Sequence, residues 1–345
     1  MPREGKRRKA TSATTKRTTL TAVVSAKPAD ARRKRVAAGA PQQSSTVAIV
    51  GAGRVGSALA LALAACGYRI SALVTNNLTH ARRAARLFTA PHPHALAATQ
   101  LASLPHTDLL IIATPDGQIG ATAAQLANAL VAHKAQPRKS PRIALHTSGA
   151  LSSDVLKDLR GAGYAVGSLH PLVSVSDART GAASLRGAFY CIEGDGAAVK
   201  AARRIVRALG GHSFSIKPTD KALYHAAAVL ASGHTVALFA LAAELLVHCG
   251  VTQQDARRAL LPLTQSTLTN LLNAPTPARA LTGPFARGDA ATVERNLAAL
   301  AALDDSTALH IYALLGRHAL RLAQELGTNA VQVEATMRAL HTSKS

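Results

Sequence analysis

The chain has 345 residues, of which 48% are hydrophobic and only 3% aromatic, and its formal net charge is +22. This length suits two domains, and the alanine-rich hydrophobic fraction favours helices packed through small residues. The scarcity of aromatic residues argues against a dedicated single-strand nucleic-acid binder, because such proteins stack bases on aromatic rings.

Residues 1–45 carry concentrated positive charge, with twelve Lys and Arg side chains against two acidic ones. No apolar run is present to bury, so the segment is predicted to be a disordered basic tail. Nonspecific contact of this tail with nucleic acid is one alternative, and an erroneously assigned upstream start is another.

We find no targeting segment, because the apolar run near residue 21 is shorter than a secretory signal requires. Later apolar runs are interrupted before the roughly 20 residues that a membrane span needs, so no membrane contact is expected. Cys66, Cys191 and Cys249 are widely spaced in apolar surroundings, and we expect buried free thiols. These features indicate a cytoplasmic protein.

From residue 46 onward, short apolar runs alternate with helical patterns. Strands are predicted over residues 46–50, 68–74, 108–113, 142–146, 164–169, 188–193 and 212–216, with helices over 54–66, 79–88, 118–133, 153–160 and 197–209. This alternation predicts a doubly wound, mainly parallel sheet. Beyond residue 220 only helical periodicity remains, so we expect an α/β domain over 46–217 and an all-helical domain over 218–345.

The first predicted strand ends in a turn, residues 51–56, that fits the pattern G-x-G-x-x-G and opens a helix. In this context the pattern indicates a dinucleotide-binding Rossmann domain, since the glycines allow the turn and the close approach of the pyrophosphate. A glycine-rich turn without a cofactor is the alternative. The predicted cofactor-binding residues are Gly51, Ala52, Gly53, Arg54, Val55 and Gly56, then Thr75 and Asn76 after the second strand, and Thr114 and Pro115 after the third.

The end of the second strand favours NADP over NAD, although NAD remains possible. Thr75, Asn76 and Asn77 stand where an NAD site has a carboxylate for the ribose hydroxyls, and Arg82 and Arg83 follow. Hydroxyl, amide and guanidinium groups can donate to a 2′-phosphate. Alternatively, the two arginines form only a solvated helix face.

Four further stretches carry a family resemblance: residues 146–152 (HTSGALS), 167–172 (GSLHPL), 221–228 (KALYHAAA) and 282–289 (TGPFARGD). With the glycine turn, they resemble bacterial proteins that join a Rossmann-like domain to domain of unknown function 2520, which are candidate NADP oxidoreductases. That family is similar in layout to pyrroline-5-carboxylate reductase, ketopantoate reductase and the 6-phosphogluconate dehydrogenase superfamily. The resemblance implies a C-terminal domain of the 6-phosphogluconate dehydrogenase type and a hydride-transfer site between the domains.

The resemblance also implies that Lys221 is the acid/base, because related dehydrogenases have a lysine at a comparable place. The family often has Ser-Asn one helical stretch later, whereas this chain has Ser232-Gly233-His234, so an amide that orients substrate is missing. From the residues alone, Lys221, Tyr224 and His225 share one helix face and could serve a carbonyl or imine. A surface lysine and a structural interdomain histidine are the alternative reading.

Three further residues complete the candidate site. His170 follows a strand and either orients substrate or bonds the backbone, and Ser148 either contacts the nicotinamide carboxamide or substrate or caps a helix. Arg287 could pair with a substrate carboxylate or form a structural ion pair. Catalytic roles are thus assigned to Lys221, His225, His170 and Ser148, and substrate binding to Tyr224 and Arg287.

The sequence therefore predicts an NADPH-dependent reductase of a small carbonyl or imine compound bearing a carboxylate. A noncatalytic dinucleotide sensor or scaffold is the alternative function. The alanine-rich C-terminal helices predict a homodimer, and the scattered histidines predict no metal site.

Overall fold

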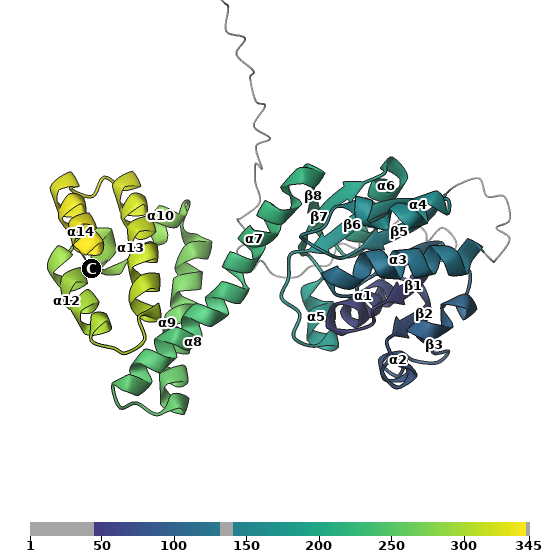
Figure 1. Cartoon of the computed structure of the whole chain (residues 1–345), viewed down its shortest axis with the longest axis horizontal. Coiled ribbons are helices and arrows are strands. Elements are labelled where there is room, and N and C mark those ends of the chain that lie inside the picture. Colours follow the sequence, from purple (N-terminus) through teal and green to yellow (C-terminus); the bar gives the residue numbers. More distant parts are fainter. Residues whose placement is uncertain (1–44, 132–140, 343–345) are drawn as a thin grey trace, which may run out of the picture. The chain divides into compact units, whose positions relative to one another are not determined.

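The computed structural model describes residues 45–131 and 141–342 and divides into two compact units (Figure 1). The N-terminal unit reaches to Ala240, and the C-terminal unit begins at Leu241. The predicted basic tail, residues 1–45, falls outside the described residues except for Ser45.

An eight-stranded sheet forms the centre of the N-terminal unit, with strand order β3-β2-β1-β4-β5-β6-β7-β8. Every neighbouring pair is parallel except β6 and β7, so the predicted doubly wound, mainly parallel sheet is confirmed. The strands are β1 (Thr46–Val50), β2 (Arg69–Thr75), β3 (His94–Ala97), β4 (Leu109–Ile112), β5 (Arg142–His146), β6 (Tyr164–Pro171), β7 (Phe189–Gly194) and β8 (His212–Phe214).

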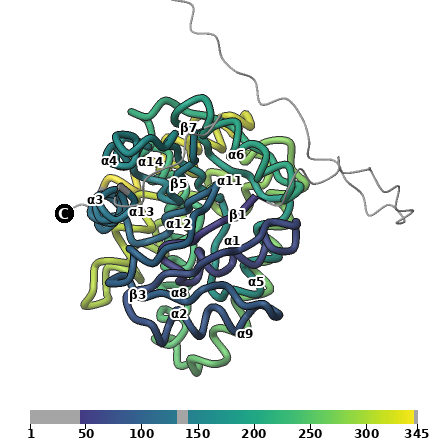
Figure 2. The backbone as a smooth tube through the Cα atoms, turned by 90° about the vertical axis from the view of Figure 1, so that its right-hand side faces the viewer, coloured from purple at the N-terminus to yellow at the C-terminus, as the bar shows by residue number. Residues whose placement is uncertain are grey.

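Helices cover both faces of this sheet, because alternate strand residues point to opposite sides. Ile111 packs in one apolar cluster with α1 and α6, whereas Leu110 and Ile112 pack in a second cluster with α3 and α4. Helix α5 lies against α1 (Figure 2). The helices are α1 (Arg54–Ala65), α2 (Leu78–Ala85), α3 (Asp116–Val131), α4 (Lys157–Gly161), α5 (Ala178–Ser184), α6 (Gly196–Ala208) and α7 (Lys221–Ala231), with 3-10 turns at Ala98–Ser103, Ser153–Leu156 and Pro218–Asp220.

One strand and one α-helix of this unit, β3 and α5, were not predicted from the sequence. Strand β3 has four residues and pairs only with β2. It directly follows Pro91 and Pro93, so the sequence there resembles a proline-bounded loop. Helix α5 has only seven residues, and its start is set by Asp177, which accepts from the backbone N–H groups of Arg179 and Thr180.

The division between the units differs from the predicted boundary at residues 217–218. Helix α7 belongs to the N-terminal unit, where Lys221 is buried and donates to Ser148 and Ser168. These acceptors are more than 50 positions away in the chain. Local periodicity therefore could not show that α7 packs on the sheet.

The C-terminal unit is helical, as predicted. Its core gathers apolar side chains of α12, α13 and α14, including Val293, Leu320 and Leu340. Asp289 caps α12 by accepting from the backbone N–H of Thr292. The helices are α8 (Gly233–His248, which begins in the N-terminal unit), α9 (Gln253–Asn273), α10 (Pro277–Ala280), α11 (Gly283–Arg287), α12 (Ala290–Ala301), α13 (Thr307–Glu325) and α14 (Ala330–Thr342).

The expectation that every apolar stretch is too short for a membrane span was wrong. The helical stretch Pro218–His248 has 31 residues, and its most apolar 18-residue part has a mean hydropathy of 1.8, which suffices for a membrane span by length and composition only. The interruption at Ser232 is short, and α8 begins directly after it. Only 6% of the most apolar part of this stretch is buried, so it presents a large apolar surface.

The expected burial of all three cysteines was also wrong. Each is a free thiol, but only Cys191 is buried, while Cys66 is half-buried and Cys249 is exposed. Cys249 follows the end of α8 beside Gly250, where the helix gives way to a turn.

Candidate functional site

Two glycines lock the turn between β1 and α1. Gly51 has a φ of +94°, and a Cβ built there would lie 2.5 Å from the backbone N of Thr114 at the end of β4. A Cβ at Gly56 would lie 2.2 Å from the carbonyl oxygen of Gly51. Both positions therefore require glycine for packing within the protein itself.

Gly53 differs, because a Cβ built there would meet no atom of the described residues within 4 Å. Gly53 precedes α1, no side chain caps this helix, and its first turn has no acidic residue. The first backbone N–H groups of α1 therefore lack an intrahelical partner and carry the positive end of the helix dipole. This arrangement is a cradle for an anion that approaches the backbone closely.

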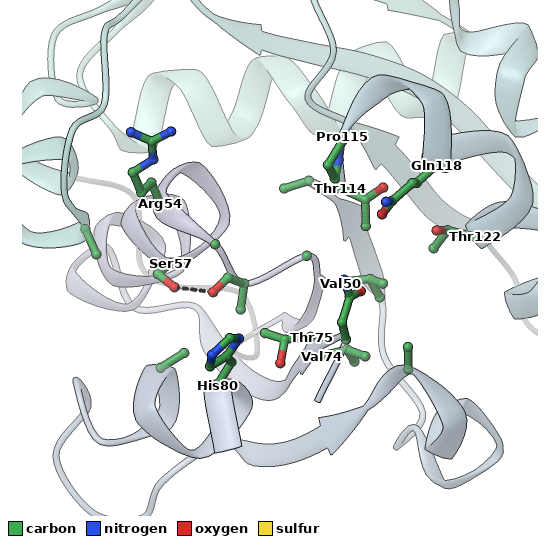
Figure 3. A pocket seen from close by; sticks show the side chains of 18 of the residues that line it. Val50, Arg54, Ser57, Val74, Thr75, His80, Thr114, Pro115, Gln118 and Thr122 are labelled. Carbon is green, nitrogen blue, oxygen red and sulfur yellow. Dashed lines mark hydrogen bonds between the residues drawn. The ribbon is translucent and has the colours of Figure 1, made fainter. Parts of the chain in front are cut away.

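The cradle opens into a cavity of about 960 Å³ in the N-terminal unit (Figure 3). In Figure 3, Thr75 and His80 lie on one side of the cavity, and Thr114, Pro115 and Gln118 lie on the other. Of the ten predicted cofactor-binding residues, Val55 and Gly56 do not line it. Those that line it are Gly51, Ala52, Gly53, Arg54, Thr75, Asn76, Thr114 and Pro115.

The β2 side of the cavity has polar and cationic side chains. Thr75 donates its hydroxyl hydrogen to the carbonyl of Asn77, so this hydroxyl has no hydrogen left for a ligand. Asn77 caps α2 by accepting from the backbone N–H of His80, and its amide lies 3.3 Å from Nδ1 of that ring. His80 and Arg83 line the cavity, whereas Arg82 does not.

The β4 side of the cavity presents an unsatisfied polar atom. The hydroxyl oxygen of Thr114 is buried and has no hydrogen-bond partner within the described residues. Thr114 and Pro115 stand at the carboxyl end of β4, where ligands of such sheets bind. A polar ligand group at this end would satisfy the hydroxyl.

Ser148 is fully committed to contacts within the protein. Its hydroxyl donates to a carboxylate oxygen of Asp116 at 2.8 Å and accepts from the backbone N–H groups of Ala150 and Leu151. The side chain is only 6% exposed. Ser148 therefore organises the end of β5, and its hydroxyl hydrogen is not available to a substrate in this structure.

Lys221 lies deeper still. Its Nζ donates to the carbonyl of Ser148 at 3.0 Å and to the hydroxyl of Ser168 at 2.8 Å. Burial lowers the pKa of the Lys221 ammonium, and nearby Cys191, Glu193 and Asp116 oppose that shift.

His170, Tyr224 and His225 come together beside this lysine. Nδ1 of His170 lies 2.6 Å from the hydroxyl of Tyr224, and its ring centroid lies 5.8 Å from that of His225. The partner of Nδ1 of His170 is thus a side chain. Gly149 makes room for the ring, since a Cβ there would lie 2.8 Å from Nε2 of His170. In His225, Nδ1 is buried without a partner in the described part of the chain.

Burial and a nearby cation keep two histidines of the site neutral. Burial, with the charge of Lys221, lowers the pKa of His146 to about 3 and that of His170 to about 4. Nδ1 of His146 accepts from the backbone N–H of Ser148, which fixes the neutral tautomer. Burial also raises the pKa of Tyr224, so its phenol keeps its proton.

Arg287 belongs to the C-terminal unit, where it is exposed at the end of α11. Its assignment as a substrate ligand remains a prediction. The Ser232-Gly233-His234 stretch marks the break between α7 and α8, with Ser232 in a non-helical conformation.

Sequence reasoning missed several polar residues of the site. His80 is three positions before Arg83, so the helical repeat could have placed both on one face. Ser168 lies two residues before His170 and on the same face of β6, but no local pattern marks it as a hydrogen-bond acceptor for a distant lysine. Glu193 is buried and accepts from the backbone and hydroxyl of Ser153, which ties β7 to the turn before α4.

A parallel strand, a glycine turn and an uncapped helix beside a large cavity are typical of a Rossmann-like fold. The comparisons agree: residues 32–171 match the Rossmann-like domain, and residues 188–319 match the domain of unknown function DUF2520. The chain therefore joins a Rossmann-like domain to a DUF2520 domain. It matches no curated protein.

Solved structures with the same fold include two bacterial proteins and one reductase. BF3122 of Bacteroides fragilis, named as a candidate NADP oxidoreductase, is 23% identical, with a TM-score of 0.62, and the match covers 81% of this chain and 98% of that one. TM1727 of Thermotoga maritima is 22% identical, with a TM-score of 0.61 and coverage of 81% and 99%. The NADP-bound pyrroline carboxylate reductase of Plasmodium falciparum is 12% identical, with a TM-score of 0.50 and coverage of 88% and 100%.

Proposed function

We propose that the protein is an NADPH-dependent oxidoreductase that reduces a small carbonyl or imine compound bearing a carboxylate. The observation that carries this proposal is the cradle at Gly53, where free helix amides face open space in a cavity of about 960 Å³. Backbone amides at a helix start suit a pyrophosphate, and Arg54 adds a cation at the same rim.

The preference for NADPH over NADH rests on the β2 side of the cavity. Asn76, His80 and Arg83 line it, and no carboxylate stands at the end of β2 to accept from ribose hydroxyls. Arg83 can pair with a 2′-phosphate, and Nε2 of His80 can donate to it because Asn77 faces the other ring nitrogen. The names of BF3122 and of the Plasmodium reductase, which both mention NADP, support this choice.

The nicotinamide, when bound, supplies the hydride to the substrate carbon. The protein must then place a proton on the oxygen or nitrogen that gains negative charge. His225 and the hydrogen-bonded pair Tyr224–His170 are the groups that lie at the carboxyl ends of β5 and β6 for this task. When the phenolic hydrogen of Tyr224 points toward the substrate, it can pass to the atom that gains negative charge, while Nδ1–H of neutral His170 donates a hydrogen bond to the phenolate until solvent returns the proton.

Turnover tests the proposal directly. We expect the protein to oxidise NADPH with a member of a panel of 2-keto acids and cyclic imines, and to lose most of that rate when the substrate carboxylate is replaced by an amide. Tyr224→Phe and His225→Gln should lower kcat about 100-fold each while leaving NADPH affinity unchanged. Tight NADPH binding without turnover of any panel member would instead favour the dinucleotide sensor.

We also propose that the protein is a cytoplasmic homodimer built on the apolar surface of its helices. Leu223 and Val236 of the stretch Pro218–His248 are 77% and 70% exposed, and Leu263 and Leu272 of α9 are 62% and 69% exposed. Exposed apolar area of this extent indicates a partner surface. A second copy of the chain exposes the same apolar helix faces, so a two-fold interface would cover these faces on both copies.

The oligomeric state tests this second proposal. Light scattering should give twice the chain mass, and Leu272→Lys should shift the protein toward the monomer, whereas Leu326→Lys, a control at an exposed leucine after α13, should not. A monomeric wild-type protein, or one recovered only with lipid vesicles, would contradict the homodimer.

A further inference from the structure

We infer that Lys221 is a positioning residue: its side chain fastens the first turn of α7 to the carboxyl ends of β5 and β6, and it does not exchange a proton with the substrate. The inference rests on the proposed function, since it concerns the same site. It reassigns the residue that sequence resemblance makes the acid/base.

The contacts of Lys221 leave no room for a substrate. Only 1% of the residue is exposed, and its Nζ donates to two neutral acceptors, the carbonyl of Ser148 and the hydroxyl of Ser168. Ser168 is itself fully buried, and its hydroxyl lies 3.3 Å from the same Ser148 carbonyl. A group that exchanges protons with a substrate must touch it, and this ammonium touches only the protein.

The position of Lys221 is matched to that of Tyr224. The two residues are one helical turn apart on α7, and their partners Ser168 and His170 are two residues apart on one face of β6. One turn of helix and two residues of strand span similar lengths, roughly 5 Å and 7 Å. Two parallel contacts, Lys221 to Ser168 and Tyr224 to His170, therefore align α7 with β6.

The first contact sets where the second one forms. Lys221 is at the start of α7, directly after the turn that leaves β8, so its anchor fixes the helix before Tyr224 and His225 are reached. Without the Lys221 anchor, only the hydrogen bond of the Tyr224 hydroxyl itself would hold Tyr224 2.6 Å from Nδ1 of His170. The role assigned to Lys221 is thus to hold two potential proton donors in place.

The charge of Lys221 also acts on its neighbours. The titratable groups around it are Asp116 at the start of α3, His146 on β5, His170 on β6, Cys191 and Glu193 on β7, and Tyr224 and His225 on α7. Its charge adds to burial in lowering the pKa of His170. Replacing the ammonium by an apolar side chain should therefore make His170 easier to protonate.

Chemical labelling of lysines tests the inference on the wild-type protein. Lys217, exposed just before α7, and Lys200, exposed on α6, are internal controls. Acylation of Lys221 should be at least about 100-fold slower than that of both controls, with and without NADPH, because only a local opening would expose it. Labelling of Lys221 in the NADPH-bound protein at the rate of Lys217 would overturn the inference.

A substitution provides a second, independent readout. In Lys221→Met, the imidazole pKa of His170 measured by NMR should rise above its wild-type value but stay below its ordinary 6.5, because burial, the larger cause of the depression, remains; in Lys217→Met it should not move. An unchanged His170 titration in Lys221→Met would contradict the inference. If Lys221→Met does not fold, the labelling result decides. Failure to bind NADPH would instead count against the proposed function and leave both results intact.

Discussion

Replacing two glycines of the same turn should separate fold stability from cofactor binding. Gly53 has a φ of −78° and a ψ of −154°, which other residues adopt, and an added methyl group meets no atom within 4 Å in the part of the chain that the structure describes. The loss of chain entropy in the unfolded state favours alanine, while its poorer N-capping disfavours it, so Gly53→Ala should change the free energy of unfolding by less than about 1 kcal/mol. Gly51→Ala places a methyl group 2.5 Å from backbone atoms at a φ of +94°. Strain and overlap should destabilise that variant by about 2–5 kcal/mol.

Gly53→Ala, which should barely change stability, should strongly lower the affinity for NADPH. In Gly53→Ala, the methyl group occupies the open space through which a pyrophosphate would reach the helix amides. The loss of two charge-assisted hydrogen bonds, about 1.5–3 kcal/mol each, corresponds to an affinity lowered at least about 100-fold. NADPH fluorescence titration and urea denaturation of both variants measure the two effects. A Gly53→Ala protein that binds NADPH within about threefold of wild type would refute the proposed position of the pyrophosphate.

The remaining predictions concern cofactor selectivity and pH. Arg83→Ala should lower the affinity for NADPH about tenfold and leave the affinity for NADH unchanged, because one charge-assisted contact to the 2′-phosphate is lost. Arg82 does not line the cavity, so Arg82→Ala should change neither affinity. Equal effects of the two variants would be inconsistent with the site. Folding depresses the pKa values of His146 and His170 below their ordinary 6.5, so as the pH falls the unfolded chain takes up protons at these positions before the folded protein does. Their contribution to the free energy of unfolding is therefore fully present above about pH 6.5 and is lost as the pH falls below it. Between about pH 7 and pH 5, each histidine should cost about 2 kcal/mol of unfolding free energy, and His170→Gln should show a smaller loss than wild type in urea titrations.

The sequence predicted the sheet best where strands are buried on both faces. Strand β5 was predicted with the observed bounds, Arg142–His146, and β1 likewise, because each has an uninterrupted apolar centre that is buried. Strand β3 was missed because an edge strand of four residues, His94–Ala97, carries little pattern.

The glycine turn could be predicted because its chemistry is local. Gly51 and Gly56 are required by contacts within a few residues or with the adjacent strand, whereas Gly53 leaves open space for a ligand at a helix start. The environment of Lys221 could not be predicted in this way. Its acceptors are 73 and 53 positions away, so only the tertiary structure shows that this lysine is buried.

The central claim is that a dinucleotide lies across the carboxyl ends of β1, β2 and β4 with its pyrophosphate on α1. A crystal structure of the chain with NADPH tests this claim most directly. We expect pyrophosphate oxygens within about 3 Å of the backbone N–H groups of Arg54 and Val55, and the 2′-phosphate beside Arg83. NADPH bound elsewhere in the chain, with the Gly53 cradle filled by protein atoms, would contradict the account.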